Sequence, residues 1–342
     1  VQDEIANAVV GSLQLRLLGA AAKEMPSRSQ NIGAYNLYLK GRFLAQRRSG
    51  PDDFERAIEY LEQAVEMDPE YALAWAGLAY ARNNQADHGY LKPEIGLAGA
   101  AAAIDRALEL DPDLAYAWAV LGEIRNELEW NWQGSSEALE KAQELSPDDP
   151  EIMRRRAELA ITMGDLDEAI ELAKKASHLE PLSYLPLTVL ALAYTQAGQW
   201  DQALGTSHKI LEIRPDHSYE PVRRARIALA RQRPEEAMTQ LEEVTKEPDS
   251  TTHRAMAFYA MGRPAEAGDL LIQAAEHPDV LTTRMAEAYA FMDEPDIAFE
   301  WMERAYEARE SRITTIKGNP FLASLHSDPR WTAFLQKMDL PE

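Results

Sequence analysis

Two short clusters of arginine are the residues best suited to chemistry in this chain. They lie at Arg154–Arg156 and within 223–226, in a sequence whose formal net charge is −22. A guanidinium group presents several N–H donors in a planar fork that matches a carboxylate. Three consecutive helical residues cannot share one face, so at most two of each cluster point the same way. The clusters predict either an anion-binding spot for an acidic segment of a partner or pairing with the chain's own glutamates.

Residues that could catalyse a reaction or hold a metal form no recognisable pattern. The seven histidines are scattered, without a His-Glu-x-x-His motif or a pair at helical ligand spacing. The segment Gly96–Gly99 runs on into alanines and lacks the lysine of a phosphate-binding loop. The chain has no cysteine, which excludes disulfides and thiolate metal sites. We therefore predict no catalytic residue, no metal and no cofactor, and a chain that is not itself an enzyme.

The composition predicts a folded protein with an acidic surface. Hydrophobic residues make up 46% of the chain, and the net charge of −22 disfavours nonspecific binding to nucleic acid or anionic membranes. The charge suits a basic partner, or acidic helix faces that keep the chain in solution. No apolar run reaches the roughly 18 residues that a membrane span needs. We expect a cytoplasmic protein, or a periplasmic one if a membrane span precedes the chain.

A regular spacing of prolines predicts the elements that position these residues. Pro147, Pro181 and Pro215 stand 34 residues apart, and prolines at 69, 112, 248 and 278 continue the series. The residue before a proline is disfavoured in the helical region, so each X-Pro pair ends one helix and lets the next begin. A fixed period near 34 indicates a repeat of two helices.

Small residues recur 12 positions apart on the two predicted helices of each repeat. Two helices approach to roughly 8 Å only where the side chains at their crossing are small. We therefore expect these residues to mark the crossings. The pairs are Ala157/Ala169, Ala191/Ala203, Ala225/Ala237, Ala255/Ala267 and Ala286/Ala298.

Two segments match the opening signature of the tetratricopeptide repeat. They are Trp75-x-x-Leu78-Ala79 and Trp118-x-x-Leu121-Gly122, and with the 34-residue period the chain resembles this family over residues 31–310. The resemblance implies an all-α fold, a right-handed α-solenoid of about eight helix pairs with extra N-terminal and C-terminal capping helices. We expect an N-terminal amphipathic helix and linker in residues 1–30, the repeat array in 31–310 and C-terminal capping helices in 311–342.

Two irregularities carry local expectations. The second repeat has about nine extra residues by the period of the family, and we place them in a loop over Gln85–Leu97. At the end of the chain, we expect Ser327 to cap a last helix that carries Trp331 and Phe334 on one face.

The resemblance also implies a binding surface. In this family the first helix of each pair lines a concave groove through its second, fifth, ninth and twelfth positions. A mixed polar, aromatic and aliphatic groove suits a protein or peptide ligand, either an extended segment or an inserted helix. The residues implied in this way are Tyr116, Glu123, Asn126, Arg154, Glu158, Thr188, Tyr219 and Arg226.

Residues 2–18 predict an amphipathic helix before the repeats. Ile5, Val9, Leu13 and Leu17 form an apolar stripe at four-residue spacing. Such a stripe packs on its own chain or on a second copy, so one prediction is a homodimer through this helix. The chain begins with valine in mid-helical sequence, which favours a fragment of a longer protein.

Several segments together resemble the C-terminal tetratricopeptide module of multidomain bacterial signalling proteins. They are the opening Val-Gln-Asp-Glu-Ile-Ala, then Ala34–Arg42, Glu129–Trp132 and Asn319–Trp331. In those proteins a class III adenylate or guanylate cyclase domain, or a winged-helix DNA-binding domain, precedes a TolB-like segment and the repeats. The resemblance implies a non-catalytic interaction or regulatory module that senses or recruits a partner. The alternatives are a fragment of a nucleotide cyclase, or of a transcription regulator, whose output domain lies upstream of Val1.

Overall fold

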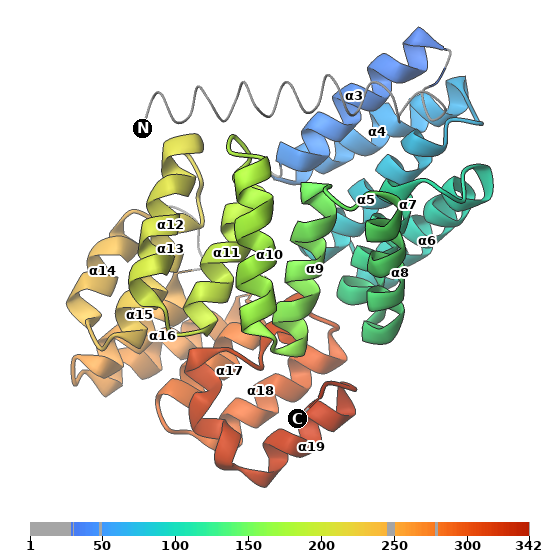
Figure 1. Ribbon diagram of the computed structural model, residues 1–342. Helices are drawn as coiled ribbons and strands as arrows, with labels where there is room; N and C mark the ends of the chain where they lie inside the picture. Colours follow the sequence, from blue (N-terminus) through green and yellow to red (C-terminus); the bar gives the residue numbers. More distant parts are fainter. Residues whose placement is uncertain (1–28, 30, 48–49, 245–249, 278–279, 342) are drawn as a thin grey trace. The chain divides into compact units, whose positions relative to one another are not determined.

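The computed structural model describes residues 29, 31–47, 50–244, 250–277 and 280–341 (Figure 1). Helices are the regular elements of these ranges, which contain no strand. This confirms the predicted all-α class. The predicted helix over residues 2–18, with its apolar stripe, lies outside the described residues.

The helices form consecutive pairs, eight of them within the described ranges, as the repeat predicts. The first helices are α3 (Ile32–Arg47), α5 (Ala72–Asp87), α7 (Ala115–Ile124), α9 (Pro150–Met163), α11 (Leu185–Gln196), α13 (Glu220–Ala230), α15 (Thr251–Ala260) and α17 (Thr282–Phe291). The second helices are α4 (Pro51–Met67), α6 (Pro93–Leu110), α8 (Trp132–Leu145), α10 (Leu166–Leu179), α12 (Trp200–Ile213), α14 (Pro234–Glu242), α16 (Pro264–Glu276) and α18 (Pro295–Glu307).

Shorter elements complete the chain. A π-helical turn, η2 (Arg125–Glu129), follows α7. Two 3-10 helices, η3 (Ser311–Thr315) and η4 (Pro320–Ser327), follow the last pair and precede α19 (Pro329–Lys337). These last three elements are the C-terminal helices that the sequence predicts.

The chain divides into two compact units. Unit 1 comprises the residues up to Leu159 together with Lys175–Pro181, and unit 2 comprises Ala160–Lys174 and the residues from Leu182 onward. Within each unit, successive first helices pack on one another, as α3 on α5, α5 on α7, α13 on α15 and α15 on α17. We call the surface formed by these helices the first-helix face of that unit.

The small residues at the predicted crossings are fully buried. Every alanine of the five pairs named above has an exposed fraction of 0%. In the first repeat, a Cβ atom added to Gly41 would lie 2.9 Å from the carbonyl oxygen of Ala57 on the paired helix. In the third repeat, the Ser135 hydroxyl donates to the carbonyl oxygen of Gly122 over 2.7 Å. The helices therefore approach closely at these crossings, which leaves room only for glycine or a small side chain.

In the second and third repeats, the signature tryptophan donates a hydrogen bond to the turn before its helix. The indole N–H of Trp75 donates to the carbonyl oxygen of Pro69 over 3.0 Å, and that of Trp118 donates to Pro112 over 2.7 Å. A proline at a helix end leaves its carbonyl outside the helical hydrogen-bond ladder. In these two repeats the tryptophan supplies the missing donor.

Two local expectations are wrong. Most of the range Gln85–Leu97 is helical, because α5 continues to Asp87 and α6 begins at Pro93, a residue well suited to the first helical position. The extra residues therefore lengthen two helices. The cap of α19 is Asp328 and not Ser327, because Pro329 occupies the first turn and the Asp328 carboxylate accepts from the N–H of Arg330.

We predict opposite effects for two glycine substitutions. Gly41→Ala should lower the free energy of unfolding by about 1–3 kcal/mol, because its Cβ overpacks the α3–α4 crossing. Gly205→Ala should raise it by about 0.5–1 kcal/mol, because a helix-interior alanine costs less backbone entropy than glycine, and no atom lies within 4 Å of the new Cβ. Urea unfolding followed by tryptophan fluorescence measures both. A Gly41→Ala protein as stable as the original would contradict the tight crossing.

Candidate functional site

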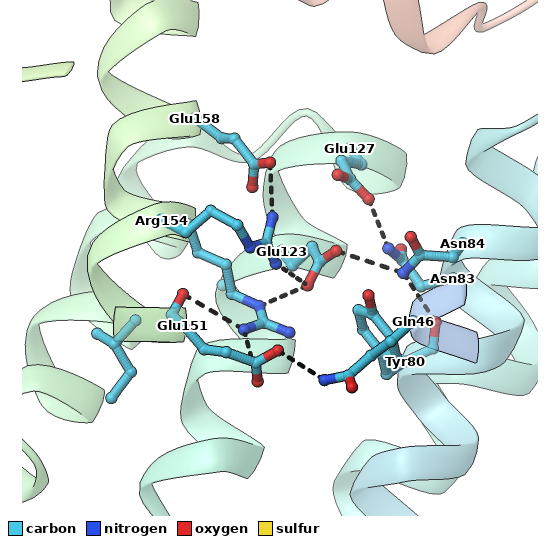
Figure 2. A network of polar contacts seen from close by, with 12 residues as sticks. Gln46, Tyr80, Asn83, Asn84, Glu123, Glu127, Glu151, Arg154 and Glu158 are labelled. Atoms are coloured by element: carbon cyan, nitrogen blue, oxygen red, sulfur yellow. Dashed lines mark hydrogen bonds and ion pairs between the residues drawn. The ribbon is translucent and has the colours of Figure 1, made fainter. Parts of the chain in front are cut away.

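The first-helix face of unit 1 contains a group of paired charged residues, of which Figure 2 labels Glu123, Glu151 and Arg154. We call it the unit 1 cluster, and it consists of Arg42, Glu123, Glu151, Arg154 and Arg155. The side chain of Arg42 is 37% exposed and that of Glu151 is 13% exposed. The side chains of Glu123 and both consecutive arginines are 2%, 2% and 1% exposed. Three first helices, α3, α7 and α9, contribute these residues.

Ion pairs join these helices. The Nε atom of Arg155 donates to Glu123 over 2.5 Å, and its Nη1 atom lies 3.4 Å from the Glu151 carboxylate. Arg154 donates to Glu158 over 2.6 Å and lies 3.9 Å from Glu123. The Glu151 carboxylate also accepts from Gln46 of α3 over 3.1 Å. The arginines therefore pair with the chain's own glutamates, which was one of the two alternatives that the sequence left open.

Aromatic rings and an amide surround the guanidinium group of Arg155. Its Cζ atom lies 5.4 Å from the ring centre of Tyr80 and 5.7 Å from that of Tyr116. The side-chain amide of Asn84 donates to the second oxygen of Glu123 over 3.3 Å. Cation–π contacts of this kind hold a guanidinium plane in one orientation.

The charges change the ionisation of their neighbours. Burial alone would raise the pKa of Glu151, yet the guanidinium groups of Arg155, Arg42 and Arg154 lower it to about 2. Burial raises the pKa of Tyr116 well above its ordinary value, and the Glu151 carboxylate raises it further. At neutral pH the glutamate is therefore ionised and the tyrosine is neutral.

Several buried polar atoms of unit 1 make no hydrogen bond. They are Nε and Nη2 of Arg154, Nη2 of Arg155, and the side-chain oxygens of Asn83, Asn84 and Asn126. All five residues are at most 8% exposed. Buried polar groups in proteins almost always have a hydrogen-bond partner, so such a concentration of orphaned atoms needs a reason.

Asn126 lies where the first helix of the third repeat changes from α-helical to π-helical geometry. The π-helical turn η2 contains it and ends at Trp130, which adopts a left-handed backbone with φ of 57°. The φ of Trp130 belongs to the turn of the repeat, because Gly164, Gly198 and Gln232 have positive φ at the same position of the next three repeats. The π-helical turn itself is particular to this repeat among the described ones, and such turns are frequent at functional sites. In the same turn, Glu127 accepts from the side-chain amide of Asn83 over 2.5 Å.

The first-helix face of unit 2 contains a second group of buried charges. We call it the unit 2 cluster, and it consists of Tyr219, Arg226, His253, Arg284 and Glu287. Arg284 donates to both carboxylate oxygens of Glu287 over 2.8 Å and to the Tyr219 hydroxyl over 2.9 Å. Arg226 pairs with the same carboxylate and lies 3.0 Å from a ring nitrogen of His253.

Two arginines for each carboxylate make this cluster electropositive. Burial would raise the pKa of Tyr219, but the guanidinium groups of Arg284, Arg226 and Arg312 lower it to about 8. Burial likewise opposes ionisation of Glu287, and the charges of Arg226 and Arg284 outweigh it, so its pKa falls well below its usual range.

The structure distributes the predicted groove residues between the two clusters. Glu123 and Arg154 belong to the unit 1 cluster, and Tyr116, Asn126 and Glu158 lie against it. Tyr219 and Arg226 belong to the unit 2 cluster. Thr188 belongs to neither, and its hydroxyl donates to the carbonyl oxygen of Leu185 over 2.7 Å.

Sequence reasoning named Arg155 within an arginine cluster but not as a groove residue, and it did not single out Arg284 or Glu287. Arg155 and Arg284 each precede the small crossing residue of their helix by two positions, and Glu287 follows its crossing residue by one. These positions are buried, because they flank the helix crossing. A charged residue two positions before or one position after the crossing residue therefore indicates a buried ion pair, and the sequence contains this signal.

Within the described ranges, no three histidine or acidic residues are placed to hold a metal ion. In the same ranges, no helix combines the length and the apolar character that crossing a membrane requires.

Family comparison agrees with this arrangement of helix pairs. One family model described as tetratricopeptide repeat matches residues 160–220, and another matches residues 40–88 and 131–181. The chain carries tetratricopeptide repeats. Repeats of this family generally mediate protein–protein interactions. These matches cover repeats and do not extend to a cyclase or winged-helix domain.

Solved structures share the fold at low sequence identity. The human IFIT1 dimer with m7Gppp-AAAA is 18% identical with a TM-score of 0.58, over 78% of this chain and 70% of that chain. A monomeric IFIT1 mutant with Gppp-AAAA is 17% identical with a TM-score of 0.56, over 80% and 71%. The human IFIT1 dimer with PPP-AAAA is 18% identical with a TM-score of 0.52, over 75% and 69%. A search of curated proteins gave no match.

We predict that the unit 1 cluster makes the free energy of unfolding fall as the pH is lowered below 4.5. The pKa of Glu151 falls from its ordinary value of 4.5 to about 2 in the folded protein. The contribution of its carboxylate to the free energy of unfolding is therefore complete above pH 4.5 and is lost as the pH falls toward 2. Glu151→Gln should lower the free energy of unfolding at pH 7 by up to about 3 kcal/mol. The difference from the unsubstituted protein should shrink toward pH 2.

Urea unfolding at pH 7, 4 and 3 measures this dependence. Glu59→Gln is the matched control, because Glu59 is exposed on α4. A pH dependence that is unchanged by Glu151→Gln would show that other carboxylates dominate acid unfolding.

Proposed function

We propose that this chain is a non-catalytic interaction module that binds an extended peptide segment of a partner protein at the first-helix face of unit 1. The observation that supports it most is the set of orphaned polar atoms on Asn83, Asn84, Asn126, Arg154 and Arg155. They combine N–H donors of guanidinium groups with oxygen acceptors of side-chain amides. An extended peptide backbone offers the complementary pattern, since each residue carries one carbonyl acceptor and one N–H donor.

The charge balance of the cluster favours backbone recognition over an acidic partner. Its three arginines face Glu123 and Glu151, and Glu158 adds a third negative charge against Arg154. The cluster is therefore close to neutral. A strongly acidic segment would have to compete with carboxylates that are already bound, whereas a peptide carbonyl needs only the unused N–H groups.

The π-helical turn supports a site at this position and not elsewhere on unit 1. It ends the first helix of the third repeat and places Asn126 about one turn after Glu123. An irregular turn next to unsatisfied amides has a cost in stability. Binding sites characteristically have this cost.

The remaining predictions define the biological setting that we propose. The module is the partner-recruiting C-terminal part of a bacterial signalling protein, with a cyclase or winged-helix output domain upstream, and it acts in the cytoplasm. Residues 1–30, 31–310 and 311–342 are its helix and linker, its repeat array and its cap. The Ile5/Val9/Leu13/Leu17 stripe would pair two copies. The segments quoted for the family resemblance support this setting.

We predict that Asn126→Leu separates binding from folding. The side-chain oxygen of Asn126 has no hydrogen bond within the chain, so replacing the amide by an apolar group of similar size should leave stability equal or raise it. The same change removes an acceptor for the peptide. Affinity should fall at least about fivefold, which corresponds to roughly 1 kcal/mol.

The measurement begins with a random-peptide display library selected against the full chain, followed by fluorescence-polarisation titration of a selected peptide. Asn36→Leu on the exposed side of α3 is the control and should change neither affinity nor stability. Unchanged peptide affinity in the Asn126→Leu protein would contradict the proposed site. Selected peptides that bind only through a different surface would contradict it as well.

A further inference from the structure

A segment after the last repeat lies on the first-helix face of unit 2. It comprises Ser311–Ser327, with η3 and η4 at its two ends, and we call it the strap. The strap side chains Ile316, Phe321 and Leu322 are 0%, 4% and 0% exposed, so it is packed into this face. The sequence reading of residues 311–342 as a cap did not anticipate which surface the strap covers.

The strap follows the first helices as an extended peptide ligand would. At its start, the side-chain amide of Gln196 on α11 donates to the carbonyl oxygen of Thr315 over 2.9 Å. Next, the Lys317 ammonium group donates to the carbonyl oxygen of Met163 at the end of α9, also over 2.9 Å. Further along, the Ser324 hydroxyl donates to the carbonyl oxygen of Ala290 on α17 over 3.1 Å.

Asn319 and Phe321 are the specific contacts between the strap and the unit 2 cluster. The side-chain amide of Asn319 donates to Glu287 over 2.6 Å, and its own oxygen accepts from the N–H of Phe321. The Phe321 ring centre lies 4.7 Å from the Cζ atom of Arg226 and 5.9 Å from the ring centre of Phe291. The Glu287 carboxylate therefore binds the Asn319 amide. The guanidinium group of Arg226, which pairs with that carboxylate, contacts the ring of Phe321, two residues after Asn319.

Gly318 allows this close approach. A Cβ atom added there would lie 2.9 Å from the Cβ atom of Gln196. The backbone of the strap therefore packs against the side chain of Gln196, with no room for a side chain at residue 318.

We propose that the first-helix face of unit 2 is a second recognition surface, and that the strap is its ligand in cis. The surface fits a partner segment with a side-chain amide followed, two residues later, by an aromatic ring. This goes beyond the function proposed above, which concerns unit 1. The strap excludes such a segment until it is displaced.

Tethering explains why the surface is closed in the free chain. A ligand joined to its site by a short linker has an effective concentration in the millimolar range, so a free peptide with the same contacts competes poorly. The strap is built from 3-10 helices, whose hydrogen-bond geometry is weaker than that of an α-helix. Loss of its two anchoring side chains therefore shifts the competition toward the free peptide.

The first experiment weakens the strap in the full chain. The probe is a fluorescein-labelled peptide with the sequence of residues 311–327, titrated by fluorescence polarisation into the unsubstituted protein and into an Asn319→Ala/Phe321→Ala protein. We expect the variant to bind the probe at least tenfold more tightly than the unsubstituted protein. A probe with alanine at the positions of both anchors should not bind. Equal affinity for the two proteins, or no binding to the variant, overturns the proposal.

The second experiment keeps the test decisive if the double variant folds poorly. The chain has no cysteine, so Gln196→Cys/Gly318→Cys can form only the disulfide that locks the strap. The two Cβ atoms would need to separate from 2.9 Å by less than about 1 Å to reach disulfide geometry. The reduced protein lacks the bond from Gln196 to Thr315 and carries a crowded Cβ atom at residue 318, and both changes weaken the strap. It should therefore bind the probe more tightly than the unsubstituted protein, and the oxidised protein should not bind it, with equal circular dichroism for both. Equal binding by the two forms, or binding by neither, overturns the proposal.

The outcome is independent of the proposed site in unit 1. Asn126→Leu should leave the affinity for the strap peptide unchanged, because Asn126 belongs to the other unit. A loss of library-peptide binding with intact strap exchange, or the reverse, identifies which of the two proposals fails.

Discussion

The burial of arginine between first helices constrains both units of this chain. A guanidinium group cannot lose its charge in a protein, so it can be buried only where carboxylates and hydrogen-bond acceptors surround it. Arg155 meets this condition through Glu123 and Glu151, and Arg284 meets it through Glu287 and Tyr219. Removal of one partner would leave an uncompensated charge, so the residues of each cluster depend on one another.

The two units meet the same constraint in different ways. In unit 2 the carboxylate of Glu287 accepts from two arginines and from an asparagine of the strap, and the strap also covers Arg226 with an aromatic ring. In unit 1 the corresponding amide comes from Asn84 on a neighbouring first helix, and guanidinium N–H groups remain without hydrogen bonds. The comparison supports the proposal of a recognition site on unit 1, where buried N–H groups lack partners, and of a second site on unit 2 that the strap covers.

The sequence predicted most of the fold because its signals are local. Proline spacing and the small residues at the crossings act within one helix pair, so they located the pairs and the fully buried alanines. Position within the first helix also selected Glu123, Arg154, Tyr219 and Arg226 as inward-facing residues. Arg155 was named only through its arginine cluster, and Arg284 and Glu287 were missed, because positions beside a crossing are usually apolar.

The rest depends on contacts between distant segments. The contact between Asn319 and Glu287 joins two segments that α18 and η3 separate in the sequence. The residues around Pro320 contain no local pattern that predicts which part of the chain they contact. The π-helical turn at Arg125–Glu129 similarly reflects the packing around Asn126 and not the preference of its residues. The length of α5 and α6 was misjudged because extra residues in a repeat can extend helices as readily as they form a loop.

The position of the strap after the helices that it covers has a consequence for biosynthesis. A ribosome completes the helices α11, α13, α15 and α17 before it reaches Ser311, so the residues that the strap covers are synthesised first. Arg226 and Glu287 stay solvated during that interval, until the strap is made and packs over them. Translation that stops between Phe291 and Ser311 would leave this surface exposed.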